Sequence, residues 1–190
     1  MKLFKLMMLA MLLSVTGMAS AADYDIDTKG AHASIQFRIK HLGYSWLTGR
    51  FNTFRGNFSY DEKNPAASRV EVVIETASID SNHAERDKHL RDERFLDVNK
   101  YPTAAFFGTS FEQRTDGTAL LTGTLELHGV SRPIQIEVEK IGHGPDPWGG
   151  YRMGFTGTTT IALKDFGINT KFGPDSQHVE LTLHVEGIRR

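Results

Sequence analysis

The chain has 190 residues, of which 39% are hydrophobic and 24% charged, and it contains no cysteine. This length suits one globular domain, and the lack of cysteine excludes disulfide bonds, thiol catalysis and thiolate metal sites. Lys and Arg number 22 against 23 for Asp and Glu, so the charge balance gives no indication of a nucleic-acid-binding protein.

The first 21 residues have the pattern of a secretory signal peptide. Lys2 and Lys5 precede an apolar run, and small residues follow it. The run is shorter than the roughly 20 residues that a membrane-spanning helix needs. An A-x-A site predicts cleavage after Ala21. We therefore expect an exported protein whose mature part, residues 22–190, forms a single domain.

Apolar and polar residues alternate along most of the mature chain, and this period of two indicates β-strands. The last run is the clearest, because Val179, Leu181, Leu183 and Val185 alternate with polar residues. Short turn signals rich in Asp, Asn, Gly and Pro separate the runs, so neighbouring strands are expected to pair antiparallel. In chain order, the expected strands lie near residues 24–28, 34–40, 54–60, 70–75, 103–111, 121–127, 134–139, 151–164 and 178–186.

One charged segment departs from the alternation. Its pattern predicts a short surface helix at about 82–92, with Asp80 or Ser81 as the N-cap. Apolar residues are too few for this helix to belong to the core. On its solvated face we expect ion pairs at helical spacing, such as Asp87 with Arg91.

The strands have two usual arrangements, a sandwich of two sheets or a closed barrel. Gly56, Gly123 and Gly157 lie on the apolar faces, where curvature or a close approach requires a residue without a side chain. These glycines and the length of the strands favour a barrel with its apolar face inside. A membrane barrel would carry an apolar outer face, whereas the outer faces here are rich in charge.

Catalytic motifs are absent from the sequence: G-x-S-x-G, S-x-x-K, H-E-x-x-H and G-x-G-x-x-G do not occur. His83 and His89 lie six residues apart, about 240° around a helix, and so do not share a metal ion. One alternative function is a hydrolase or isomerase that acts on an amphiphilic substrate, with either histidine as the general base. The other is a non-catalytic stress-response or interaction protein with a barrel filled by its own side chains.

Two aromatic turns stand out. The segment at residues 41–47 places Tyr44 and Trp46 either at a barrel mouth, where amphipathic rings suit a boundary between water and lipid, or in a packed corner. The segment at residues 146–150 is interpreted as a structural corner, with a rim contact as the alternative.

The chain resembles the YceI-like family along almost the whole mature length. That resemblance implies a lipocalin-like, eight-stranded antiparallel barrel with an elongated apolar pore, a location in the periplasm, and binding of long polyisoprenoid chains. It implies no catalytic residues and no cofactor. The segments that carry it are H-L-G-Y-S-W at 41–46, N-H-A-E-R-D-K-H-L-R at 82–91, K-Y-P at 100–102, G-V at 129–130, D-P-W-G-G at 146–150 and K-D-F at 164–166.

The expected ligand is thus an isoprenoid lipid, such as a quinone or a polyprenyl compound. Transient contact with the inner membrane or a membrane redox protein is expected, and a homodimer is left open as a possibility of assembly. Binding of nucleic acid is not expected. Arg86, Lys88 and Arg91 are expected near a charged head group. The candidate ligand-binding residues, taken from the alternation and the aromatic turn, are Ile35, Phe37, Ile39, Tyr44, Trp46, Phe54, Phe58, Phe106, Leu121, Leu125, Ile136, Phe155, Ile161, Leu181 and Leu183.

Overall fold

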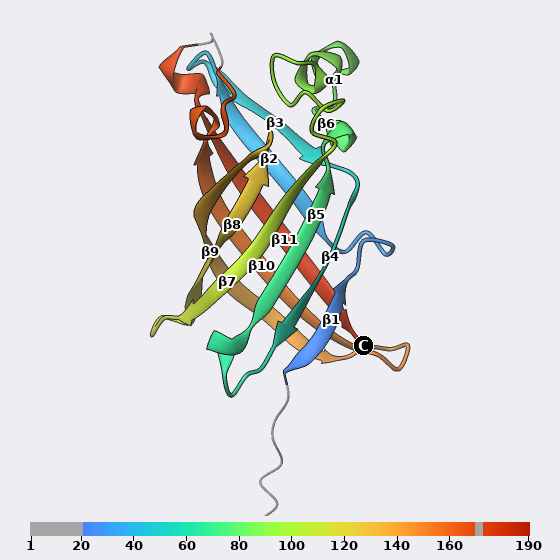
Figure 1. The fold of residues 1–190 in the computed structure, drawn as a ribbon. Helices are drawn as coiled ribbons and strands as arrows, with labels where there is room; N and C mark the ends of the chain where they lie inside the picture. Colours follow the sequence, from blue (N-terminus) through green and yellow to red (C-terminus); the bar gives the residue numbers. More distant parts are fainter. Residues whose placement is uncertain (1–20, 170–172) are drawn as a thin grey trace, which may run out of the picture.

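The computed structural model describes residues 21–169 and 173–190. Within them, eleven strand segments form a single antiparallel sheet that closes on itself (Figure 1). The predicted signal peptide lies outside these residues except for Ala21, so its cleavage stays a prediction. The strands are β1 (Ala22–Ile26), β2 (Ser34–His41), β3 (Ser45–Phe51), β4 (Phe54–Tyr60), β5 (Arg69–Glu75), β6 (Ile79–Asp80), β7 (Thr103–Gln113), β8 (Thr118–Leu127), β9 (Val130–Pro145), β10 (Tyr151–Ala162) and β11 (His178–Arg189).

The eleven segments make eight rows, because three rows are each split in two. Strand β11 pairs with both β1 and β2, so β1 and β2 form one row. In the next row, β4 pairs with β1 and β3 pairs with β2. In the third, β5 pairs with β4 and β6 pairs with β3. The β1–β11 pairing closes the ring. The structure therefore confirms the predicted eight-stranded antiparallel barrel.

Strand β3 was not among the expected strands, and it begins at Ser45, within the segment interpreted as an aromatic turn. Its inward residues include Leu47 and Phe51, with Gly49 between them. Trp46, a large aromatic residue on the opposite face, breaks the alternation that would have revealed this strand.

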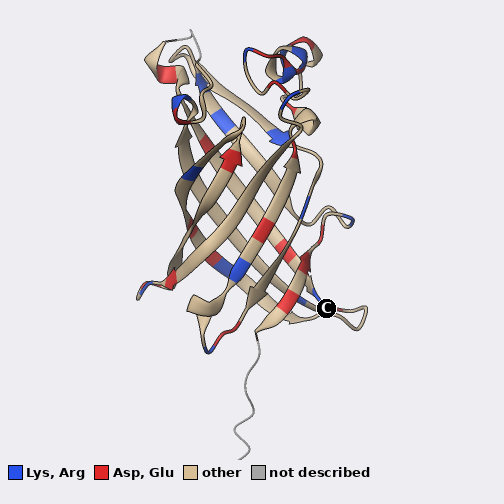
Figure 2. Cartoon of the chain, in the orientation of Figure 1, with Lys and Arg blue, Asp and Glu red and all other residues tan. Residues whose placement is uncertain are grey.

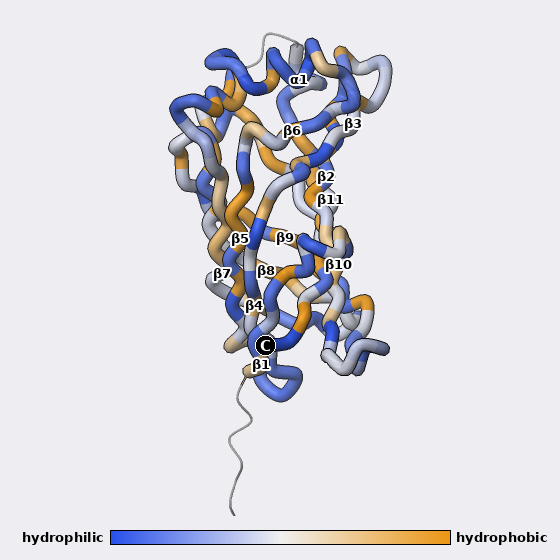
Figure 3. The backbone as a smooth tube through the Cα atoms, turned by 90° about the vertical axis from the view of Figure 1, so that its right-hand side faces the viewer, coloured by the Kyte–Doolittle hydropathy of each residue, from blue (hydrophilic) through white to orange (hydrophobic). Residues whose placement is uncertain are grey.

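The barrel has two different ends (Figure 1). The α1 end carries helix α1 (Ala84–Arg91), the β2–β3 turn, and the 3-10 turns Leu163–Phe166 and Pro174–Ser176. The β1 end carries the C-terminus and the β4–β5, β7–β8 and β9–β10 connections. Charged residues are dense in the α1 segment, and apolar residues follow the strands between the two ends (Figures 2 and 3).

Aromatic rings inside the barrel lie flat against glycines of the wall. A Cβ atom built on Gly123 would overlap the Phe106 ring, and one built on Gly187 would overlap the Phe58 ring. At Gly157, a Cβ atom would come within 2.9 Å of Ile136 Cγ2. Inner glycines therefore make room for neighbouring side chains, as their position on the apolar faces predicted.

Helix α1 is attached to the barrel by polar contacts. Its N-cap is His83, whose ring nitrogen Nδ1 accepts the Arg86 amide at 3.2 Å, so the predicted Asp80 or Ser81 cap was wrong. Asp87 does not pair with Arg91 in solvent: it is buried and accepts the Ser81 amide at 2.8 Å and the Ser81 hydroxyl at 2.5 Å. Local sequence rules missed the cap because histidine is not among the preferred N-cap residues. They missed the Asp87 contact because it runs to Ser81, outside the helix.

No helix within residues 21–169 and 173–190 is both long and apolar enough to cross a membrane.

Candidate ligand-binding site

A cavity of about 110 Å³ lies inside the barrel, between inward-facing residues of β4, β5, β7, β8, β9, β10 and β11. Six of the predicted residues line it, and the alternation of the strands had placed all six on inner faces. Val70, Val72, Phe111, Val138 and Val185, which follow the same alternation, also line it. The six are Phe58, Phe106, Leu121, Ile136, Phe155 and Leu183.

Other predicted residues face the interior away from this cavity. Phe37, Leu125 and Ile161 are buried in the apolar core, with Ile35, Phe54 and Leu181 packed against it. Ile39 pairs with Leu47 on the inner face and is half-buried.

Trp46 and Tyr44 do not line the interior. Trp46 stands opposite Lys40 on the outer face, with its ring 4.2 Å from the Arg38 guanidinium carbon. Tyr44 is 86% exposed in the β2–β3 turn. The packed-corner interpretation of this segment is therefore wrong, and both rings lie in solvent near the α1 end. Any contact of these two rings with a ligand must therefore form outside the barrel.

An aromatic plug fills the barrel toward the β1 end and consists of Tyr24, Phe58, Tyr60, Phe111 and Phe155. Tyr24 and Phe58 stack with centroids 4.8 Å apart, and Tyr60 meets Phe155 edge-on at 5.4 Å. Phe111 lies 5.9 Å from Tyr60. The pore expected to be elongated is thus interrupted, because rings from four strands meet across the lumen.

Toward the α1 end the barrel is less tightly closed. Strand pairing between β5 and β7 ends at Glu75 and Thr103, and no pairing within the described residues joins β6 to β7. Ile39 and Leu47, inward residues near this end, are half-buried. The wall of paired strands is therefore less complete at the α1 end.

Comparison with known proteins places this barrel in a family. The model of the YceI-like domain matches residues 24–187. A UPF0312 protein of Pseudomonas aeruginosa strain LESB58 is 59% identical over 178 residues, covering 94% of this chain and 93% of that protein. A UPF0312 protein of Shewanella sp. strain W3-18-1 is 58% identical over 172 residues, covering 90% of each. The chain belongs to the YceI-like family.

Solved structures show the same fold. The YceI protein of Campylobacter jejuni superposes with a TM-score of 0.70 at 27% identity, covering 80% of this chain and 90% of that one. A polyisoprenoid binding domain from Saccharophagus degradans superposes with a TM-score of 0.64 at 16% identity, covering 90% of this chain and all of that one.

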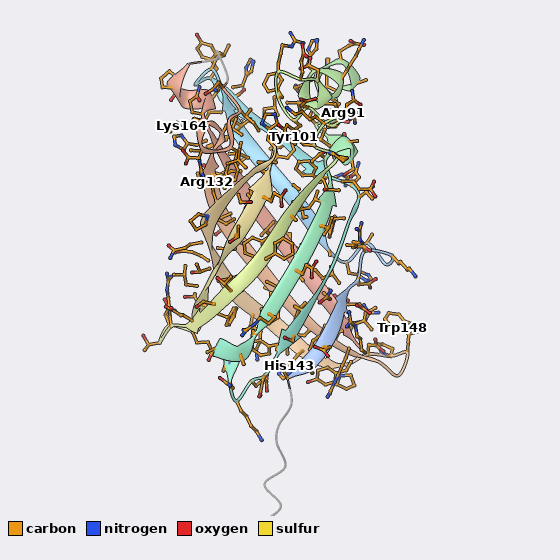
Figure 4. All side chains as sticks on the ribbon, viewed as in Figure 1. Arg91, Tyr101, Arg132, His143, Trp148 and Lys164 are labelled. Atoms are coloured by element: carbon orange, nitrogen blue, oxygen red, sulfur yellow. The ribbon has the colours of Figure 1, made fainter. Side chains whose placement is uncertain are left out.

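Several of the segments by which this chain resembles other YceI-like proteins hold the α1 end together. Tyr101 packs on Gly129, where any Cβ atom would meet its ring, and its ring lies 4.5 Å from that of His128. His128 Nδ1 lies 3.2 Å from the carbonyl oxygen of the almost fully buried Phe166. Figure 4 shows Arg91, Tyr101 and Lys164 at this end and His143 and Trp148 at the other.

The basic residues expected near a charged head group serve the fold of this YceI-like domain. Arg86 donates to the Ser81 carbonyl at 2.6 Å, and Arg91 donates to the carbonyls of Ala77 and Ile79 at 2.7 and 2.6 Å. These bonds occupy both guanidinium groups. Only Lys88 of the three remains on the exposed side of the helix.

Near the β1 end, an ion network ties the β9–β10 turn to the barrel. Asp146 accepts the amides of Trp148 and Gly150 and the Arg152 guanidinium. Arg152 also donates to Asp27 at 2.8 Å. Hydrogen bonds from Arg152, then His32 and the Gly30 amide, lower the pKa of Asp27 to about 2. The segment at residues 146–150 is therefore a structural corner.

Asp27, His32 and Glu186 are close enough together to resemble a metal site. Arg152 already donates to both carboxylates, at 2.8 and 2.5 Å. The guanidinium thus occupies the position that a cation would take, and the group is an ion network.

A larger hollow, of about 1220 Å³, lies mainly along outward residues of β8, β9, β10 and β11. Its lining includes Thr122, Gln135, Thr158 and Thr182, with Arg38 paired to Glu180. Apolar residues line it as well, among them the predicted Ile161 and Leu181. The interior cavity has the more uniformly apolar lining, as ligand pockets usually do, so it is the candidate site.

Proposed function

We propose that this chain is a non-catalytic binding and carrier protein of the periplasm for a long-chain isoprenoid lipid, such as a quinone or a polyprenyl compound. The observation that carries the proposal is an apolar cavity enclosed by a barrel of the YceI-like family. The similarity in fold to a domain described as polyisoprenoid binding supports it.

The energetics favour exchange over permanent capture. Moving a 40-carbon chain from water into an apolar site is worth about 30 kcal/mol at ~0.8 kcal/mol per carbon. This exceeds the ceiling of about 20 kcal/mol on real affinities, so ordering costs are large. The lipid's alternative surroundings are a membrane, not water. The net preference is a small difference between two apolar environments, which suits a carrier.

Uptake of a long chain requires the barrel interior to rearrange. Ligand pockets usually measure about 300–1,000 Å³, whereas the present cavity measures about 110 Å³. The half-buried inner residues, among them Phe51, Phe155 and Leu181, are the side chains with room to move. We expect the lipid to enter at the α1 end, where the wall of paired strands is less complete.

We further propose that the α1 end contacts the membrane during exchange. Leu42, Tyr44 and Trp46 project there as exposed apolar side chains, and Arg38 and Lys40 lie beside the Trp46 ring. Aromatic rings next to cations suit the interface of an anionic bilayer.

The decisive test is chemical analysis of the protein purified from its own periplasm. Extraction with organic solvent and mass spectrometry should yield a stoichiometric isoprenoid, and N-terminal sequencing should begin at Ala22. A clean extract, from a protein that also refuses an added quinone, polyprenol and polyprenyl phosphate, would overturn the proposal in favour of a filled-barrel interaction protein.

A further inference from the structure

One polar atom beside the interior cavity has no hydrogen-bond partner. Among residues 21–169 and 173–190, Ser68 Oγ is the buried side-chain oxygen or nitrogen left without one. Ser68 is 8% exposed and lines the cavity. Counting from the inward residues Val70 and Val72, its side chain also points inward. A buried hydroxyl without a partner costs roughly 1–3 kcal/mol, so its presence here needs an explanation.

A second residue with a hydroxyl group, Tyr60, lies on the strand that pairs with β5. Phe58 pairs with Val70 and Ser59 with Arg69, so the same register places Tyr60 opposite Ser68. Directly opposite residues have Cβ atoms about 4.5–5.5 Å apart. Tyr60 also lines the cavity, is 5% exposed, and has its hydroxyl 3.5 Å from Gln113 Nε2, the outer limit of a hydrogen bond.

Cations near this pair are already engaged. The Arg69 guanidinium donates to the Ala67 and Ser68 carbonyls at 3.1 and 2.7 Å. Lys140 lies 2.7 Å from a Glu62 carboxylate oxygen. Arg69, which lines the cavity, is thus held by two backbone carbonyls with its side chain exposed to solvent. An anionic group beside Ser68 would have to give up its hydration, which is far more costly than burying an uncharged oxygen.

We propose that the Ser68 and Tyr60 hydroxyls bind an uncharged oxygen of the ligand, such as a prenol hydroxyl or a quinone carbonyl. This inference rests on the proposed lipid-binding function and adds the ligand's polar end to it. The oxygen-bearing end then lies in the layer of the aromatic plug, to which Tyr60 belongs. The plug rings must therefore separate around the chain, which extends toward the α1 end. A lipid drawn from a membrane surface would enter with its polar end first.

A matched series of three ligands with the same carbon chain tests the proposal. Farnesene has no oxygen, farnesol carries a hydroxyl, and farnesyl phosphate carries an anion. Using delipidated protein and calorimetric titration, we expect farnesol to bind about 5- to 10-fold more tightly than farnesene, the gain of one hydrogen bond. Farnesyl phosphate should bind more weakly than farnesol.

Ser68→Ala should remove the preference for farnesol while leaving the affinity for farnesene unchanged. It should also raise the thermal midpoint of the ligand-free protein, because it removes an unsatisfied hydroxyl. Tyr60→Phe should reduce farnesol binding in the same direction. Ser131→Ala, the same change at an exposed position of β9, is the control and should alter neither ligand affinity nor stability.

The outcomes separate this inference from the function on which it rests. Binding of all three ligands with equal affinity, unchanged by Ser68→Ala, would overturn the polar subsite and leave lipid binding intact. Failure of the wild-type protein to bind any of the three would overturn both. Stronger binding of farnesyl phosphate than of farnesol would overturn the preference for an uncharged oxygen.

Discussion

Asp27 and Arg152 show how single residues set the response of the barrel to acid. Arg152 joins three carboxylates from separate parts of the chain, and Asp27 is 6% exposed at the centre of the network. Because the hydrogen bonds lower the pKa of Asp27 to about 2 from an ordinary 3.8, its ionised form stabilises the fold. That stabilisation is complete above about pH 4 and is lost as the pH falls toward 2.

Replacing Asp27 with Asn should lower the free energy of unfolding by about 1–2 kcal/mol at neutral pH, since the ionised acceptor is lost. The gap between wild type and variant should close between pH 4 and pH 2. Urea unfolding at a series of pH values measures it, with the exposed Asp23→Asn as the control. A gap that stays constant down to pH 2 would contradict the assignment.

Glycines on the inner wall offer a second prediction at this scale. Gly123→Ala places a methyl group against the Phe106 ring and the Phe107 carbonyl oxygen. Overpacking of this kind typically costs about 1–3 kcal/mol. Gly142→Ala is the matched control, because no atom lies within 4 Å of its Cβ position, and we expect a change below about 0.5 kcal/mol. Equal effects in denaturant unfolding would disprove the packing argument.

At the scale of elements, α1 depends on the strand before it. The helix has eight residues, too few to be stable alone. Its bonds to Ser81, Ala77 and Ile79 anchor it to β6 and the preceding turn. These contacts give the 82–91 segment a structural role, so its resemblance to the family does not require that it bind the ligand.

Arg91→Met keeps the aliphatic part of the side chain and removes both bonds to carbonyls. We expect amide hydrogen exchange in residues 81–102 to accelerate about tenfold or more, while β8 and β9 remain unchanged. Lys88→Met, on the exposed side of the same helix, should leave exchange unaltered. Acceleration throughout the barrel would show instead that α1 and the barrel unfold as one unit.

At the scale of the whole molecule, the two ends of the barrel have different tasks in the proposed function. Aromatic rings close the β1 end, whereas the α1 end has the less complete wall and the exposed Tyr44 and Trp46. The two tryptophans of the chain lie at opposite ends: Trp46 is 43% exposed and Trp148 is 77% exposed. Each can therefore report on the approach of one end to a membrane.

Two single-tryptophan proteins test the orientation. Trp148→Phe leaves Trp46 as the fluorophore, and Trp46→Phe leaves Trp148. With anionic vesicles containing brominated lipids, we expect quenching of Trp46 and little quenching of Trp148, decreasing at high salt. Quenching confined to Trp148 would reverse the proposed orientation, and quenching of neither would remove membrane contact from the mechanism.

The sequence by itself determined most of the strands and most of the inner face, and it favoured a closed barrel over a sandwich. Alternation is a local property, so a run such as Val179 to Val185 reveals which side chains face inward before any partner strand is known. The same local rule identified Phe58, Phe106 and Phe155 as interior residues, and it missed β3 because Trp46 interrupts the pattern.

Only the tertiary structure decided where the interior is filled and where it is open. The aromatic plug forms because rings from separate strands meet across the lumen, which depends on strand register. The β4–β5 register, continued one residue beyond Ser59 and Arg69, brings Tyr60 opposite Ser68, and the Ser68 hydroxyl is left without a partner. No sequence pattern marks such a serine, because its significance lies in residues distant along the chain.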